Sequence, residues 1–162
     1  YYRAPNFSLK NKWMLDCLID NGITVSSSIK SPIKHNGKIL PNEPFMFTRN
    51  GKQIIEFPLT TKYLIFFKFA YSGSGYFRIL PPFLLHRIYA RDSYLMTYFH
   101  PNDFDLKVPT PSGLGYIRNT LNTIGTNTTL KKMESLAKKY SFNSISQALQ
   151  LNEQKDFELI EF

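Results

Sequence analysis

The chain has 162 residues, of which 43% are hydrophobic and 20% charged, a globular composition that excludes an intrinsically disordered chain. The formal net charge is +8, but the basic residues are scattered and no nucleic-acid-binding motif accompanies them, so we expect no nucleic-acid partner. The longest apolar stretches, such as 63–67, are far too short to span a bilayer, and no transmembrane segment is expected.

The chain contains a single cysteine, Cys17, which excludes an internal disulfide. An oxidising compartment is therefore not required, and a cytoplasmic location is the simplest expectation. The first residue is Tyr rather than Met, and Tyr1–Arg3 already has the pattern of a strand. We therefore expect that an N-terminal portion precedes this chain.

Strands and helices are predicted to alternate through the first part of the chain. Strands are expected at 1–3, 23–29 and 53–59, and a helix runs from Ser8 or Asn11 to about Asn21. The segment 30–52 is rich in proline and holds the pairs Asn36-Gly37 and Asn50-Gly51. Because Asn-Gly is a hairpin-turn signal, this segment is interpreted as an insertion with β structure.

The second part of the chain is predicted to be mostly helical. A glycine- and serine-rich loop at 71–76 precedes a helix at 82–91 and a strand at 94–99. Three further helices follow a proline-rich loop, at 113–124, 129–140 and 145–151. Strand–helix alternation indicates an α/β fold with parallel strands, in which active sites gather at the carboxyl ends of the strands. Arg3, the serines at 26–28 and His100 fall at such ends.

Several segments together resemble the polysaccharide deacetylases, the NodB-homology carbohydrate esterases. Arg3-Ala4-Pro5-Asn6-Phe7 is similar to their Arg-x-Pro-x-aromatic motif, and Tyr98-Phe99-His100-Pro101 to the motif that ends in the catalytic histidine. The blocks 56–60 and 72–81 resemble the subgroup that has an extra C-terminal segment. The resemblance implies a partial (β/α) barrel over residues 1–105, with the insertion at about 30–52, and a helical C-terminal extension over 106–162.

The same resemblance implies a divalent metal, zinc in most members, held by one Asp and two His. These ligands belong to motifs that precede the Arg-x-Pro motif, and neither motif occurs in this chain. The other two histidines, His35 and His86, do not pair with His100 at ligand spacing. We therefore assign no metal ligand to this chain and expect the fragment alone to be inactive and to bind no catalytic zinc.

Two residues take catalytic roles by resemblance. Arg3 would hold the base aspartate, since a guanidinium presents a fixed fork of donors to a carboxylate. His100 would be the general acid that protonates the departing amine, a task that suits a histidine titrating near neutrality. The alternatives are a surface arginine that follows a strand and a histidine satisfied within a turn.

One position departs from the family pattern. The strand at 23–29 usually ends in Asp-Ser-Ser-aliphatic, and that aspartate supports the catalytic histidine. Ser26-Ser27-Ser28-Ile29 stands here instead, with Ser26 at the aspartate position. Serine cannot supply a charge to an imidazolium, so another carboxylate, Asp103 or Glu56, is a candidate for that work.

Three residues are candidates for binding substrate. Phe7 would form a wall of a sugar groove or pack in the core, and Tyr76 would stack on a sugar ring or lie in a plain loop. Glu56 would bind sugar hydroxyls or be an exposed strand glutamate.

The predicted function is metal-dependent removal of N-acetyl groups from a polysaccharide, which makes the intact protein a hydrolase of amide bonds. Its expected partner is a polysaccharide or oligosaccharide, and an exposed sheet edge would allow self-association. The alternatives are a non-catalytic carbohydrate-binding or assembly protein on a degenerate deacetylase fold, which Ser26 favours, and an unrelated basic binding module, which only the net charge supports.

Overall fold

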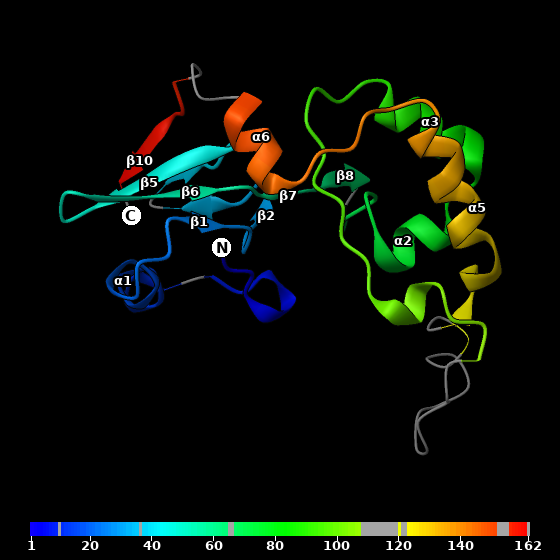
Figure 1. Cartoon of the computed structure of the whole chain (residues 1–162), viewed down its shortest axis with the longest axis horizontal. Helices are drawn as coiled ribbons and strands as arrows, with labels where there is room; N and C mark the ends of the chain where they lie inside the picture. The colour runs from blue at the N-terminus through cyan, green and yellow to red at the C-terminus, as the bar shows by residue number, and fades with distance from the viewer. Residues whose placement is uncertain are drawn as a thin grey trace. The chain divides into compact units, whose positions relative to one another are not determined.

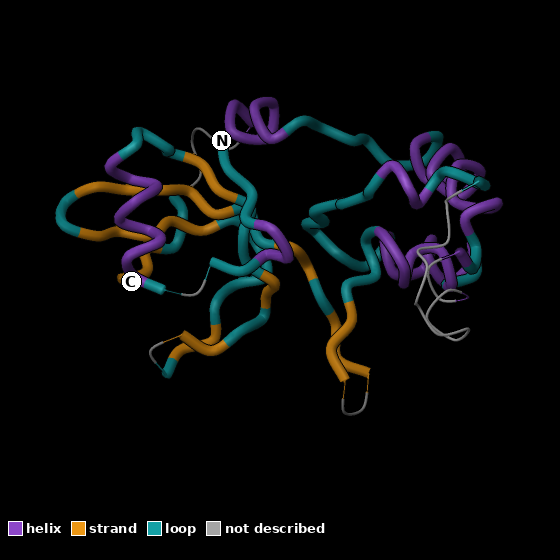
Figure 2. Tube along the Cα trace, turned by 90° about the horizontal axis from the view of Figure 1, so that it is seen from below, coloured by secondary structure: helices purple, strands orange, loops and turns teal. Residues whose placement is uncertain are grey.

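The computed structural model describes residues 1–9, 11–35, 37–64, 67–107, 120, 123–151 and 156–161. It is mixed α/β and divides into two compact units (Figures 1 and 2). The first unit comprises residues 1–68, 94–96 and 143–162, and the second comprises 69–93 and 97–142. The sequence predicted that a partial barrel ends near residue 105. The division into two compact units does not test that prediction.

A mixed sheet forms the centre of the first unit, with the strand order β1-β6-β5-β10 in the described part of the chain. Its strands are β1 (Val25–Ser26), β6 (Lys52–Glu56), β5 (Phe45–Arg49) and β10 (Leu159–Glu161). β1 pairs with β6 and β10 with β5 in parallel, whereas β5 and β6 are antiparallel. The sequence predicted parallel strands but no strand in the tail that holds β10. Among the described residues neither this sheet nor the three two-stranded sheets close into a barrel, and the barrel stays a prediction.

The antiparallel pairing follows from the turn chemistry of the insertion. Asn50 and Gly51, which separate β5 from β6, have positive φ angles of 51° and 72°. Two successive residues in the left-handed region make the type I′ turn that closes a two-residue hairpin. The predicted β structure of the insertion is therefore confirmed, and the segment supplies a central strand of the sheet.

Short strand pairs complete the β structure of the described residues. β2 (Lys30–Ser31) pairs in parallel with β7 (Leu59–Thr60), and β3 (Lys34–His35) pairs antiparallel with β4 (Lys38–Ile39). β8 (Lys62–Leu64) pairs with β9 (Phe67–Phe69).

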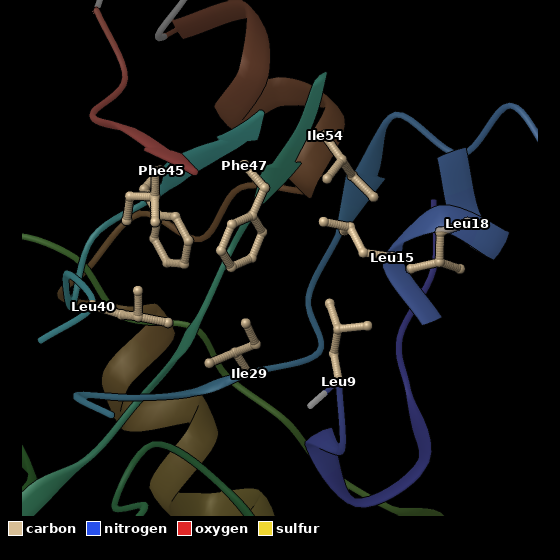
Figure 3. Close-up of a cluster of buried hydrophobic side chains, with 9 residues drawn as sticks. Leu9, Leu15, Leu18, Ile29, Leu40, Phe45, Phe47 and Ile54 are labelled. Atoms are coloured by element: carbon tan, nitrogen blue, oxygen red, sulfur yellow. The ribbon is translucent and has the colours of Figure 1, made fainter. Parts of the chain in front are cut away.

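Helix α1 (Lys12–Asp20) packs its apolar side on the sheet, and Figure 3 shows the side chains that meet there. Leu15 and Leu18 are buried, whereas Trp13 and Cys17 on the same helix are exposed. Asp16 forms an ion pair with Arg49, which ties α1 to β5. The cluster of buried side chains consists of Leu9, Leu15, Leu18, Ile29, Leu40, Phe45, Phe47, Ile54 and Ile160.

The second unit is helical. It contains α2 (Ser74–Ile79), α3 (Pro82–Tyr89), the 3-10 helix η2 (Pro101–Asp103) and α5 (Thr126–Ala137), whereas α6 (Ile145–Leu151) and the 3-10 helix η1 (Pro5–Phe7) belong to the first unit. The helices expected near 82–91, 129–140 and 145–151 are confirmed within a few residues. The helix expected at 113–124 lies largely outside the described residues.

Two predictions for residues 71–99 are wrong. The segment 71–76 is not a loop throughout, because α2 begins at Ser74 and buries Phe77 and Arg78. The segment 94–99 is not a regular strand: among the described residues its pairing is a single parallel bridge between Tyr98 and Gly73. Glycine allows the two backbones to come this close, since a Cβ on Gly73 would lie 1.7 Å from the carbonyl oxygen of Tyr98.

We expect Gly73→Ala to destabilise the protein by about 1–3 kcal/mol, the usual cost of overpacking, because the methyl group would overlap a backbone carbonyl. Urea unfolding of the purified chain measures this loss. Gly75→Ala is the matched control, because a Cβ there meets only Arg78 Nη2, at 3.7 Å. Equal stability of the two variants would show that the contact between Gly73 and Tyr98 is not close.

Candidate functional site

The carboxyl ends of three neighbouring segments meet in the first unit. Tyr2 bridges to Ser26 in parallel, and β1 pairs in parallel with β6, with Ser26 opposite Glu56. Parallel strands point their carboxyl ends the same way, so Arg3, the serines at the end of β1 and just after it, and Glu56 gather at one edge. The sequence predicted Arg3, the serines at 26–28 and His100 at strand ends. Arg3 lies beside these serines, and the place of His100 relative to them stays a prediction.

Glu56 is the centre of this cluster and is 0% exposed. Its Oε1 accepts hydrogen bonds from the backbone N–H groups of Ser28 (2.6 Å) and Ile29 (2.9 Å). Oε2 has no partner at hydrogen-bond geometry among the described residues, although the Ser26 hydroxyl is near enough to affect the carboxyl. Glu56 is therefore not an exposed strand glutamate, and its role in binding sugar hydroxyls stays a prediction.

Burial raises the pKa of Glu56 to about 7. The Ser26 hydroxyl, the two backbone N–H groups and the positive charge of Arg3 oppose that rise, in this order. The carboxyl therefore changes charge near neutral pH while sealed from solvent.

The three serines link the strand ends through their side chains. Ser26 Oγ donates to Ser28 Oγ (2.8 Å), which also accepts the backbone N–H of Ala4 (2.9 Å). Ser27 Oγ accepts from Arg3 Nη2 (2.9 Å). All three serines are buried, so the hydroxyls fix the Arg3 segment relative to β1.

Arg3 and Phe7 contact each other at the start of the chain. The Arg3 guanidinium lies 5.3 Å from the centre of the Phe7 ring, and Lys30 Nζ lies 5.6 Å from the same ring, both within cation–π range. Asn6 and Phe7 have φ angles of 55° and 53°, a left-handed conformation that costs energy in residues other than glycine. Phe7 is half-buried, and its role as a groove wall stays a prediction.

Tyr94 is a member of this cluster that the sequence did not single out. Its hydroxyl donates to the carbonyl oxygen of Pro58 (3.0 Å). Burial raises the pKa of Tyr94, the charge of Glu56 raises it further, and Arg3 lowers it. A tyrosine distant in sequence carries no local signal for such a position.

The buried position of Ser26 beside Glu56 predicts how an aspartate there would affect stability. We expect Ser26→Asp to destabilise the chain by about 2 kcal/mol at pH 8, because it buries a second carboxylate beside Glu56. The loss should shrink at pH 5, where one of the two carboxyls keeps a proton. Urea unfolding at both pH values measures the effect.

Ser27→Asp is the control for that variant, since Ser27 is equally buried but accepts from Arg3. It should lose less stability at pH 8 than Ser26→Asp. The reverse order would contradict the proximity of Ser26 to the Glu56 carboxyl.

His100 lies in the second unit, at the start of η2, and is exposed. Asp103 Oδ2 accepts the backbone N–H of His100 (2.8 Å), and the backbone N–H of Asp103 donates to the His100 carbonyl oxygen (2.9 Å). Asp103 therefore bonds the histidine backbone. Its predicted support of the imidazole, and the predicted placement of His100 at the same end as Arg3, stay predictions.

Tyr76 also belongs to the second unit, on α2, and is 40% exposed. Its ring packs against Phe69 with the ring centres 5.6 Å apart. The residues before it, Tyr71 to Gly73, are buried, and Tyr71 donates a hydrogen bond to Asp92. Tyr76 therefore lies in a helix and not in a plain loop, and its stacking on a sugar ring stays a prediction.

The described residues offer no group of three or more His, Cys, Asp or Glu side chains that would hold a metal ion. The divalent metal that the family resemblance implies does not fit the residues described in this chain, and we derive no step through it. Within the described part, no helix has the length and apolar character needed to cross a membrane.

Comparison with known proteins places the chain in a family. A family model described as Domain of unknown function (DUF3473) matches residues 26–150. The chain belongs to this family. Neither the curated proteins nor the solved structures yielded a match.

Proposed function

We propose that this chain is the C-terminal part of a polysaccharide deacetylase, in which it supplies residues on the substrate side and the general acid. The observation that carries the proposal is the order of its motifs: Arg3-Ala4-Pro5 at the start of the cluster, then Glu56-Phe57-Pro58, then His100-Pro101. Membership in the DUF3473 family over residues 26–150 supports it, since this domain sits at the C-terminal end of such enzymes.

The geometry of the first unit suits the role proposed for Arg3. Its Nη2 donates to the neutral hydroxyl of Ser27, and among the described residues it forms no ion pair with a carboxylate. A guanidinium in this state keeps donors for a carboxylate from outside the described residues, such as the base aspartate. Burial lowers the pKa of Arg3, and the negative charges of Tyr94 and Glu56, when ionised, oppose that fall and stabilise the cation.

The role proposed for His100 is proton donation to the leaving amine. Amide hydrolysis needs a proton on the departing nitrogen, and an imidazole is a common donor of such a proton. His100 is exposed, and its backbone N–H is bonded to Asp103. Ligands for a divalent metal would come from outside these 162 residues.

The test is deacetylation by the full-length protein. We expect acetate release from N-acetylated oligosaccharides of the chitin, peptidoglycan or exopolysaccharide type when zinc is present, and loss of release with a chelator. The 162-residue chain alone, assayed in parallel, should release none. Absence of release from every one of these substrates would contradict the proposal.

One observation favours a second candidate, a non-catalytic carbohydrate-binding or assembly protein. Ser26 stands where the family has an aspartate. Binding of the same oligosaccharides without acetate release, measured by calorimetry on the full-length protein, would favour this candidate over the enzyme.

A further inference from the structure

Two hydrogen bonds between His100 and Asp103 close the turn that carries His100. Asp103 Oδ2 accepts the N–H of His100, and the N–H of Asp103 donates back to the His100 carbonyl oxygen, at 2.8 and 2.9 Å. Pro101 occupies the first position of η2 and fixes its φ. The backbone at His100 is therefore held, while the imidazole remains exposed.

The carboxylate that closes this turn is held by a buried cation. Asp103 Oδ1 lies 3.2 Å from Arg78 Nε, and the two side chains are only 5% and 7% exposed. Ser74 Oγ also donates to Asp103 Oδ1 (3.4 Å). Both residues come from α2, so this helix fixes the carboxylate that fixes His100.

Helix α5 in turn holds the end of α2. Lys132 Nζ is buried and donates to the carbonyl oxygens of Phe77 (3.3 Å) and Arg78 (2.5 Å), which belong to the last turn of α2. A cation at that end is favourable, because helix carbonyls are left without partners there. Gly125, just before α5, approaches so closely that a Cβ would lie 2.3 Å from the Arg78 carbonyl oxygen.

We propose that the buried Arg78–Asp103 pair is a positioning device for His100, anchored to α5 through Lys132. It sets where the exposed imidazole stands and does not itself touch substrate. The proposal rests on the function proposed above for its consequence on turnover, but the geometric part concerns this chain alone.

The geometric part is tested by hydrogen exchange of the His100 amide in the 162-residue chain, followed by NMR. We expect Asp103→Ala to speed exchange at His100 by about 10- to 100-fold, since the charged acceptor is lost. Asp103→Asn, which keeps an acceptor but loses the charge, should give a smaller increase. The amide of Tyr140, which donates to Leu136 at the end of α5, should keep its protection in both and so report that the fold persists.

Asp105→Asn is the matched control, because Asp105 is exposed and bonds the backbone of Lys107 instead. It should leave exchange at His100 unchanged. Unchanged exchange at His100 in both Asp103 variants would overturn the proposal, whatever the full-length protein catalyses.

The effect on turnover is tested in the full-length protein. We expect Asp103→Asn to lower kcat by about 10- to 100-fold with little change in KM, since a misplaced catalytic group costs rate more than binding. In a His100→Ala background the same substitution should cause almost no further loss, because Asp103 acts through His100. An equal loss in both backgrounds would overturn the positioning role.

If the full-length protein has no deacetylase activity, the proposed function is wrong. The exchange experiment would still decide whether the pair holds His100, so the two failures are distinguishable.

Discussion

His100→Ala in the full-length protein should lower kcat for deacetylation by about 10²–10⁴-fold, the usual span for the loss of a general acid or base. The departing amine then has to leave without a proton from the enzyme. KM should change little, because the proton is needed mainly in the transition state. Initial rates of acetate release at several substrate concentrations measure both constants.

The control for this variant is His86→Ala. His86 lies in the same unit on α3, where its Nε2 is 2.9 Å from Ser135 Oγ, and it has no role in the proposed reaction. It should keep wild-type turnover. Wild-type turnover in His100→Ala would remove the general-acid role and leave the other proposed roles to be tested separately.

The sequence predicts local structure best where turn and capping chemistry agree with the fold. The pair Asn50-Gly51 supplies two left-handed residues and so indicates a hairpin, which the structure confirms. The apolar spacing in residues 12–20 likewise predicts α1. In both cases the information lies within a few neighbouring residues.

Prediction fails where distant contacts decide the structure. Ser74-Gly75 begins a pattern typical of a loop, yet α2 forms because Phe77 is buried and Lys132, far along the chain, bonds its last carbonyl oxygens. β10 is found in a tail whose acidic and apolar alternation did not indicate a sheet, because its partner β5 is more than a hundred residues away.

The candidate site shows the same limit. Motif likeness identifies Arg3 and His100, because each has a local signature. The burial of Glu56 is not visible in the sequence, where a glutamate at a strand end looks exposed. Only the pairing of β1 with β6 places its carboxyl beneath the serines, and only that burial gives it a pKa near neutrality.

That burial predicts a pH-dependent stability. The pKa of Glu56 rises from an ordinary 4.5 to about 7 on folding, so between these values the folded chain binds more protons than the unfolded chain. The stability linked to this carboxyl is fully present below pH 4.5 and is lost as the pH rises through about 7. The shift corresponds to about 3 kcal/mol.

Glu56→Gln should remove this dependence. The amide oxygen of glutamine can accept the two N–H bonds that Oε1 accepts, and its charge does not change with pH. We expect the free energy of unfolding of the variant, relative to wild type, to rise by about 3 kcal/mol between pH 4.5 and pH 8.5. Other titrating groups contribute equally to both proteins and cancel in the difference.

Glu161→Gln is the control, since Glu161 is an exposed glutamate on β10 of the same sheet. Its difference from wild type should stay nearly constant over this range. A constant difference for Glu56→Gln as well would show that the buried carboxyl does not titrate near neutral pH. A difference that rises with pH, in contrast, would mean that the charge of Glu56 beside Arg3 depends on pH. The strength with which Arg3 binds a further carboxylate would then depend on pH as well. When Glu56 is protonated, it does not compete with that carboxylate for the positive charge of Arg3. When Glu56 is ionised, its negative charge partly neutralises Arg3 and weakens the attraction.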